Sequence, residues 1–270
     1  MVGKLFKHEI KYYIRTLTFV EIILMAVALM NRLIQIFEND TAIYKIVFGS
    51  SAIMLGVTAL IAIFVTMALG IIRFYKNLFS HEGYLSFTLP VSPMQHLFVK
   101  ITTYMLFMLV TVFSVLVALS IATFGDVFVE VVKAGWYLFK VLGGKIGFVS
   151  ATMFLFEIAL LLFVNAASQM IVYYFCMSVG QLTGKSRIWL SLGVYFLIYV
   201  ATQLFETLLV ILYNVLYSAN ALDAIIEYIG GHVEGCAHFG LWFMIVFYAL
   251  VSGVYFLVSH RIISRKLNLE

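Results

Sequence analysis

The chain has 270 residues, of which 64% are hydrophobic and only 11% charged, with a formal net charge of +4. A soluble domain carries about 25% charged residues, so this composition excludes a water-soluble globular fold and indicates an all-α membrane protein. No long basic surface is available to neutralise phosphates, which argues against nucleic acid as a partner. The two cysteines, Cys176 and Cys236, are too few for a disulfide framework. Charged residues continue as far as Arg15, unlike a cleavable signal peptide.

Residues 1–16 form a basic, amphipathic segment. Apolar and basic side chains recur at helical spacing on opposite faces. The apolar set is Leu5, Phe6, Ile10, Tyr13, Ile14 and Leu17, and the basic set is Lys4, Lys7, Lys11 and Arg15. This pattern predicts an interfacial amphipathic helix lying along an anionic leaflet, with a basic cytosolic tail as the alternative.

Residues 17–270 are predicted to form a six-helix transmembrane domain. The expected spans are approximately 17–37, 46–72, 97–124, 146–179, 188–213 and 239–260. The first span is the most polar, with Glu21 near one end, expected at the interface, and Asn31, Arg32 and Gln35 near the other. The stretch 126–145 is amphipathic and aromatic, which favours a position on the membrane surface.

The distribution of basic residues predicts the orientation. With the N-terminus inside, the twelve inner Lys and Arg residues are Lys4, Lys7, Lys11, Arg15, Arg73, Lys76, Lys100, Lys185, Arg187, Arg261, Arg265 and Lys266. The five outer ones are Arg32, Lys45, Lys133, Lys140 and Lys145. Twelve against five obeys the positive-inside rule for six spans, so both termini and the segment 73–96 are expected in the cytoplasm.

No sequence pattern of an enzyme active site is found. The stretch from Gly180 to Ser186 resembles a phosphate-binding loop but has one residue too few between its glycines and follows a membrane helix instead of a strand. A group of potential metal ligands, His232, Glu234, Cys236 and His238, has a spacing that fits a solvated loop better than a standard metal site. We therefore expect no catalytic residues, no metal and no bound cofactor in this chain, and an intramembrane enzyme is the least favoured function.

Polar side chains form stripes on two spans. In the fourth span, Glu157 shares a face with Asn165 and Gln169. In the fifth, Tyr195, Tyr199, Thr202, Glu206 and Tyr213 follow steps of four, three, four and seven. Ionisable groups at membrane depth normally face a bundle interior or a wet cavity. Glu157, Gln169, Tyr199, Gln203 and Glu206 are thus candidates for a translocation pathway, and interhelical hydrogen bonding is the alternative.

The segment 73–96 between the second and third spans carries the most distinctive motif. It contains the pair Glu82-Gly83, the triplet Pro90-Val91-Ser92 and the second proline, Pro93, and Lys100 follows shortly after its end. This loop resembles the inner-face loop of ABC-2-type transporter permeases, in the version common in Gram-positive anaerobes. That family is similar in its basic first helix, six spans, inner termini and elaborated segment between spans five and six.

The resemblance implies a function and partners. The chain would be the permease subunit of an ABC exporter in the cell membrane, working as a homo- or heterodimer with a second permease. The loop would dock a separate ATPase, which binds ATP and magnesium. The implied docking residues are Lys76, Leu78, Phe79, His81, Glu82, Gly83, Tyr84 and Leu85. The alternative is an ATPase-independent carrier or channel with Glu157 and Glu206 as ion sites, although no span shows matched Gly/Pro interruptions.

Overall fold

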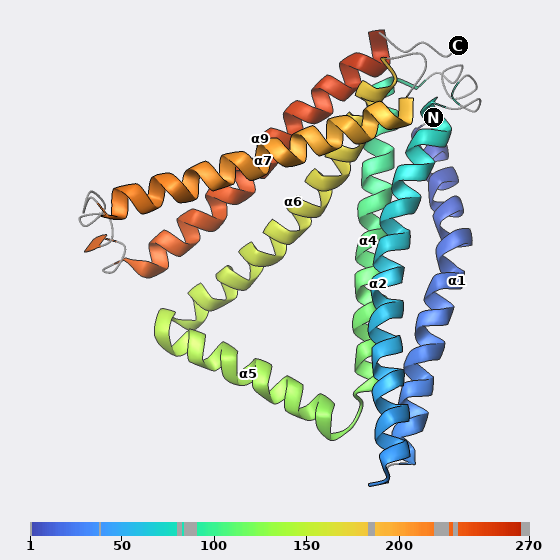
Figure 1. The fold of residues 1–270 in the computed structure, drawn as a ribbon, viewed down its shortest axis with the longest axis vertical. Coiled ribbons are helices and arrows are strands. Elements are labelled where there is room, and N and C mark those ends of the chain that lie inside the picture. Colours follow the sequence, from blue (N-terminus) through green and yellow to red (C-terminus); the bar gives the residue numbers. More distant parts are fainter. Residues whose placement is uncertain are drawn as a thin grey trace. The chain divides into compact units, whose positions relative to one another are not determined.

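The computed structural model describes residues 2–37, 39–79, 83, 91–182, 187–218, 227–228 and 232–265. Over these ranges the protein is helical and has no strand. The helices are α1 (Val2–Ile36), α2 (Ala42–Phe79), α4 (Pro93–Ala122), α5 (Asp126–Ile146), α6 (Phe148–Gly180), α7 (Arg187–Ser218) and α9 (Val233–Arg265) (Figure 1). All of these except α5 are long and apolar enough to cross a membrane, as expected of a multi-pass membrane protein.

Helix α1 runs without a break through the predicted boundary between an interfacial helix and the first span. Residues 4–36 contain neither proline nor glycine, so nothing in the sequence interrupts the helix. Near the expected boundary, the hydroxyls of Thr16 and Thr18 donate to the carbonyls of Tyr12 and Ile14 within the same helix. The amphipathic segment is therefore the first part of one long helix.

The chain divides into two compact units, Met1–Phe139 and Lys140–Glu270. The boundary lies within α5, which has a glycine in the left-handed region at each end: Gly125 has φ 120° and Gly147 has φ 84°. Only glycine adopts such conformations at low cost, so these two residues allow the chain to turn sharply into and out of α5.

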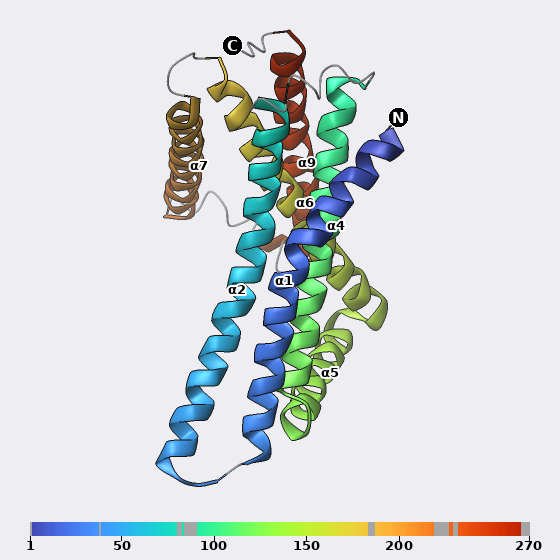
Figure 2. The same ribbon diagram turned by 90° about the vertical axis from the view of Figure 1, so that its right-hand side faces the viewer.

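In unit 1, α1, α2 and α4 lie side by side (Figure 2). A buried cluster in this unit includes Ala28 from α1, Ala62 from α2 and Ala118 from α4, all fully shielded. Small side chains let helix backbones approach closely in a membrane, where packing and hydrogen bonds drive association. A hydrogen bond of 2.9 Å between Thr66 and Thr111 also joins α2 to α4.

The polar residues that make the first span the most polar of the six form a hydrogen-bonded network at the C-terminal end of α1. Gln35 donates to the Ala122 carbonyl of α4 at 2.6 Å and to Asn31 at 2.9 Å, and Asn31 donates to Ser51 of α2 at 2.9 Å. Arg32 in turn donates to Gln35 at 3.1 Å. These residues hold the three helices together at this end of the unit.

In unit 2, α6 packs against both α7 and α9. At the junction of α6 and α7, a side chain at Gly180 would lie 2.6 Å from the carbonyl oxygen of Arg187, closer than a methyl group tolerates. The described residues of α7 include none that is buried, so this helix contributes mostly exposed surface.

We predict that Ala62→Leu destabilises the protein by about 1–3 kcal/mol, because the added atoms must fit where three helices meet. Thermal unfolding in mild detergent measures the effect. The control is Ala52→Leu on the same helix, where the side chain is exposed and no loss is expected. Equal stability of the two variants would contradict the close packing at Ala62.

Candidate functional site

A buried carboxylate connects the three long helices of unit 1. Glu9 of α1 accepts hydrogen bonds at Oε1 from Asn77 of α2, at 2.9 Å, and from Lys100 of α4, at 3.0 Å. Its Oε2 accepts from Arg73 Nε of α2 at 3.1 Å. Glu9 is only 1% exposed, and the other three residues are also buried. We call these four residues the Glu9 network.

One turn of α1 surrounds the Arg73 side chain. His8 Nδ1 lies 3.2 Å from the terminal nitrogen of Arg73, and the guanidinium lies 4.2 Å from the centre of the Tyr12 ring, a cation–π contact. Tyr12 follows His8 by four positions and Glu9 by three, so it is a neighbour of both on the surface of α1. For the same reason Arg73 and Asn77 project together from α2.

The Glu9 network lies at the two helix ends that border the segment 80–92. Asn77 is two residues before the last residue of α2, and Lys100 is in the second turn of α4. Burying a charge is costly unless it is paired and hydrogen-bonded, so the three helices are held in a definite arrangement here. The N-terminal half of α1 is thereby bonded on both sides of the segment 80–92, which belongs to the predicted docking loop 73–96.

A capping box begins α4. Ser92 Oγ accepts from the Gln95 amide at 3.3 Å, and Gln95 Oε1 accepts from the Ser92 amide at 3.1 Å. Pro93 occupies the first helical position, where its missing N–H costs nothing. The spacing of Ser92 and Gln95 is readable in the sequence as a helix start and was a signal that sequence reasoning missed.

The predicted docking residues differ in their accessibility. Lys76 is exposed, whereas Leu78 and Phe79 are buried in the structure, where Phe79 packs edge-on against Phe74 at 5.3 Å. Gly83 is also buried. Leu78 and Phe79 therefore serve the protein's own packing and do not form an accessible contact surface. His81, Glu82, Tyr84 and Leu85 lie outside the described residues, and their docking role stays a prediction.

A second buried carboxylate, Glu157, joins α6 to α9 in unit 2. Its Oε1 accepts from the Trp242 indole at 2.8 Å, and its Oε2 lies 2.7 Å from His238 Nδ1. Glu157 is 5% exposed. His238, considered above as a metal ligand, thus faces a carboxylate, and no cluster of potential metal ligands occurs among the described residues.

A cavity of about 620 Å³ lies between α6, α7 and α9 within unit 2. Its described lining residues are Ser168, Gln169, Val172, Tyr195, Ile198, Tyr199, Thr202, Phe205, Glu206, Leu209, Phe243, Met244, Phe247, Tyr248, Val251 and Tyr255. The predicted stripe on α7 lines this cavity from Tyr195 to Glu206. Gln169 of α6 lines it as well.

Two of the candidate pathway residues are not among these lining residues. Gln203 is exposed, and its amide donates to the lining residue Glu206 at 3.2 Å. Glu157 instead forms the separate contact with His238 and Trp242. The structure therefore brings Gln169, Tyr199 and Glu206 together and separates Glu157 from them, although a stripe on α6 alone suggested that Glu157 and Gln169 act together.

Glu21 lies near the middle of α1, facing Ser114 of α4, whose hydroxyl donates to its carboxylate. It lines a depression of about 530 Å³ formed by α1 and α4, with mainly apolar neighbours. The continuous α1 places Glu21 well away from the helix ends, and its expected position at the membrane interface stays a prediction. Its bond to Ser114 indicates a role in joining α1 to α4.

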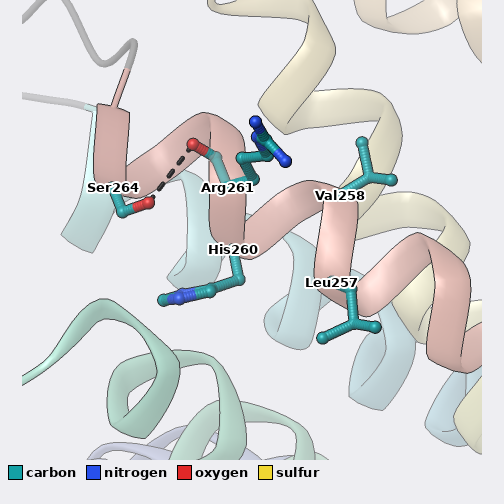
Figure 3. A pocket seen from close by; sticks show the side chains of 5 residues that line it. All are labelled: Leu257, Val258, His260, Arg261 and Ser264. Atoms are coloured by element: carbon teal, nitrogen blue, oxygen red, sulfur yellow. Dashed lines mark hydrogen bonds between the residues drawn. The ribbon is translucent and has the colours of Figure 1, made fainter.

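A smaller pocket of about 410 Å³ lies at the C-terminal end of α9. Its described lining residues, Leu257, Val258, His260, Arg261 and Ser264, all come from this helix (Figure 3). His260 and Val258 point away from each other, and Ser264 donates to the Arg261 carbonyl. The described side chains do not converge on one point, so the cavity between α6, α7 and α9 is the better candidate for binding a ligand.

We predict that Glu9→Gln lowers the free energy of unfolding by about 3–5 kcal/mol, because it leaves Arg73 and Lys100 buried without the carboxylate between them. Thermal unfolding in detergent measures the loss. Asp40→Asn is the control: Asp40 and Lys45 form an exposed pair at 3.6 Å, and no measurable change is expected. If both variants unfold like the parent, Glu9 does not hold the helices together.

We also predict that Glu157→Ala costs about 1–3 kcal/mol, because it removes the acceptor of a partly buried indole N–H and of the His238 ring. Glu157→Gln should lose less, since its amide oxygen still accepts one bond. The readout is thermal unfolding together with the emission of Trp242 in a background lacking Trp136 and Trp189. Identical losses for the two variants would contradict a hydrogen-bonding role.

Comparisons with known proteins do not assign a family to this chain. No protein-family model, no curated protein and no solved structure matches it. The function proposed below therefore depends on the sequence pattern of the loop, on the Glu9 network and on the cavity of unit 2.

Proposed function

We propose that this chain is the permease subunit of an ABC-2-type exporter, driven by a separate ATPase. The observation that carries the proposal is the Glu9 network. One carboxylate is bonded to Asn77 and Arg73 before the segment 80–92 and to Lys100 after it. The motif within this segment, Glu82-Gly83 followed by Pro90-Val91-Ser92, resembles the ATPase-docking loop of these permeases.

The mechanism follows from the rigidity of these contacts. The loop docks on the ATPase, and closing of the ATPase dimer on ATP displaces it. Because Asn77 and Lys100 are both bonded to Glu9, the displaced ends of α2 and α4 carry α1 with them. The capping box at Ser92 and Gln95 stabilises the first turn of α4 while the loop is displaced. The result is a two-state rearrangement of helices biased by nucleotide.

The expected setting is the cell membrane. Six spans with both termini and the loop in the cytoplasm obey the positive-inside rule. A second permease, identical or related, completes the transport unit. Binding and hydrolysis of ATP with magnesium occur in the partner ATPase.

The alternative, an ATPase-independent carrier, is favoured by one observation. Glu206 is a titratable group that lines a cavity and lies in a candidate membrane span, as ion-coupled carriers require. In that case no ATPase would be needed, so the identity of the bound partner separates the two functions.

The test is purification of the tagged chain from its native membrane in mild detergent, with co-purifying chains identified by mass spectrometry. We expect an ATPase that carries its own phosphate-binding loop. Glu82→Ala and Tyr84→Ala should each lower its recovery by about tenfold, the loss expected when a central interface contact worth about 1.4 kcal/mol is removed.

The control is Glu130→Ala, an exposed carboxylate of α5 outside the loop, which should leave the recovery unchanged. Chemical cross-linking before extraction guards against loss of a weak complex. The absence of any nucleotide-binding chain after cross-linking would overturn the proposal and favour the carrier. Equal recovery with all three variants would show that the loop is not the docking site.

A further inference from the structure

We propose that the cavity between α6, α7 and α9 binds a hydrophobic organic cation with a single positive charge, held between Glu206 and aromatic rings. The inference rests on the proposed function in one respect: the cavity is taken as the site of the transported substrate. It adds the chemical class of that substrate. Neither the loop motif nor the topology specifies this class.

The charge of the cavity indicates a cation. Glu206 is the only charged side chain among the lining residues that the structure describes, and they include no Lys, Arg or His. Among the residues that the structure describes, its hydrogen-bond partner is the neutral amide of Gln203, at 3.2 Å. A carboxylate at membrane depth is costly without a counter-charge, so a bound cation would offset the cost of placing Glu206 here.

The walls of the cavity indicate that the cation is hydrophobic. Seven of the described lining residues are aromatic, contributed by α7 (Tyr195, Tyr199, Phe205) and α9 (Phe243, Phe247, Tyr248, Tyr255). Aromatic faces attract cations, and the attraction is larger where water is excluded. A small hydrated ion would gain little from such walls, because most of the wall surface is apolar and cannot replace its water shell.

Some of these rings are fixed before any ligand arrives. Tyr195 packs on Tyr173 with ring centres 5.3 Å apart, and Tyr255 packs on Phe175 at 4.8 Å. Ser168, at the α6 side, donates to the Tyr248 carbonyl at 3.1 Å and so ties α6 to α9. Preorganised rings lose little conformational entropy on binding, which favours a defined site over a flexible groove.

The size and the opening of the cavity limit the ligand further. About 620 Å³ lies within the range of about 300–1,000 Å³ typical of sites for drug-sized molecules. Tyr199, Phe205 and Phe243 are each more than half exposed, so the cavity opens to the surface of the unit. A zwitterionic lipid headgroup fits poorly, because its phosphate would approach Glu206 with no described cation in the lining to receive it.

The experiment uses two probes of nearly equal size and opposite charge, tetraphenylphosphonium and tetraphenylborate. Binding of radiolabelled tetraphenylphosphonium to the purified full chain is measured by equilibrium dialysis in a neutral detergent. We expect saturable binding that tetraphenylborate does not displace. Glu206→Gln should weaken binding by about tenfold or more, and Tyr199→Ala by about threefold to tenfold, the range expected for one cation–π contact.

Glu130→Gln, which neutralises an exposed carboxylate outside the cavity, is the matched control and should bind like the parent. Glu206→Asp keeps the charge and should bind better than Glu206→Gln. Size-exclusion elution confirms that each variant is folded. The proposal is overturned if the parent shows no saturable binding, if tetraphenylborate competes equally, or if Glu206→Gln binds like the parent.

These outcomes are separable from failure of the proposed function, since ligand binding requires no ATPase. Cation binding without any ATPase partner would leave the cavity assignment standing and overturn the exporter. An ATPase partner without cation binding would support the exporter and overturn the assignment of the cavity to a cation.

Discussion

The buried carboxylate of Glu9 is the interaction on which the arrangement of unit 1 depends. It is bonded to side chains of both α2 and α4, and all four members of the network are buried. Apolar side chains give little preference for one arrangement of membrane helices, because contact with lipid tails is as apolar as contact with another helix. A charge that must be paired admits few alternative arrangements, so the Glu9 network selects one register of the three helices.

Both units place carboxylates on their long helices, but the surroundings of these carboxylates differ. In unit 1 a carboxylate is surrounded by cationic and amide donors and is closed off from solvent. In unit 2, Glu157 is likewise satisfied by Trp242 and His238, whereas Glu206 faces a cavity and accepts, within the described part of the chain, a hydrogen bond from Gln203. The satisfied carboxylates hold helices together, and the one beside a cavity is the one suited to a ligand.

These features fit one proposed cycle. In that proposal, the loop bordered by Asn77 and Lys100 would receive the motion of an ATPase, and the Glu9 network would pass it to α1. Unit 2 holds the cavity and is connected to unit 1 through α5, which has the positive-φ residues Gly125 and Gly147 at its ends. In the proposed cycle, contact with the ATPase and binding of the ligand would thus belong to different units of one chain.

The sequence by itself determined the helical membrane class and the approximate position of each span, because long apolar runs can satisfy their backbone only as helices in lipid. It also determined the α7 stripe of Tyr195, Tyr199, Thr202 and Glu206, since helical periodicity alone places these residues on one face. Only the tertiary structure decided which stripes meet. Glu9 lies in the segment predicted to be an amphipathic helix, and the sequence pattern gave no sign of its partners. It pairs with Arg73 and Lys100, which are far away in the chain and close in space. Glu157 pairs with His238 of α9 for the same reason. Periodicity within one helix carries no information about the partner that another helix presents.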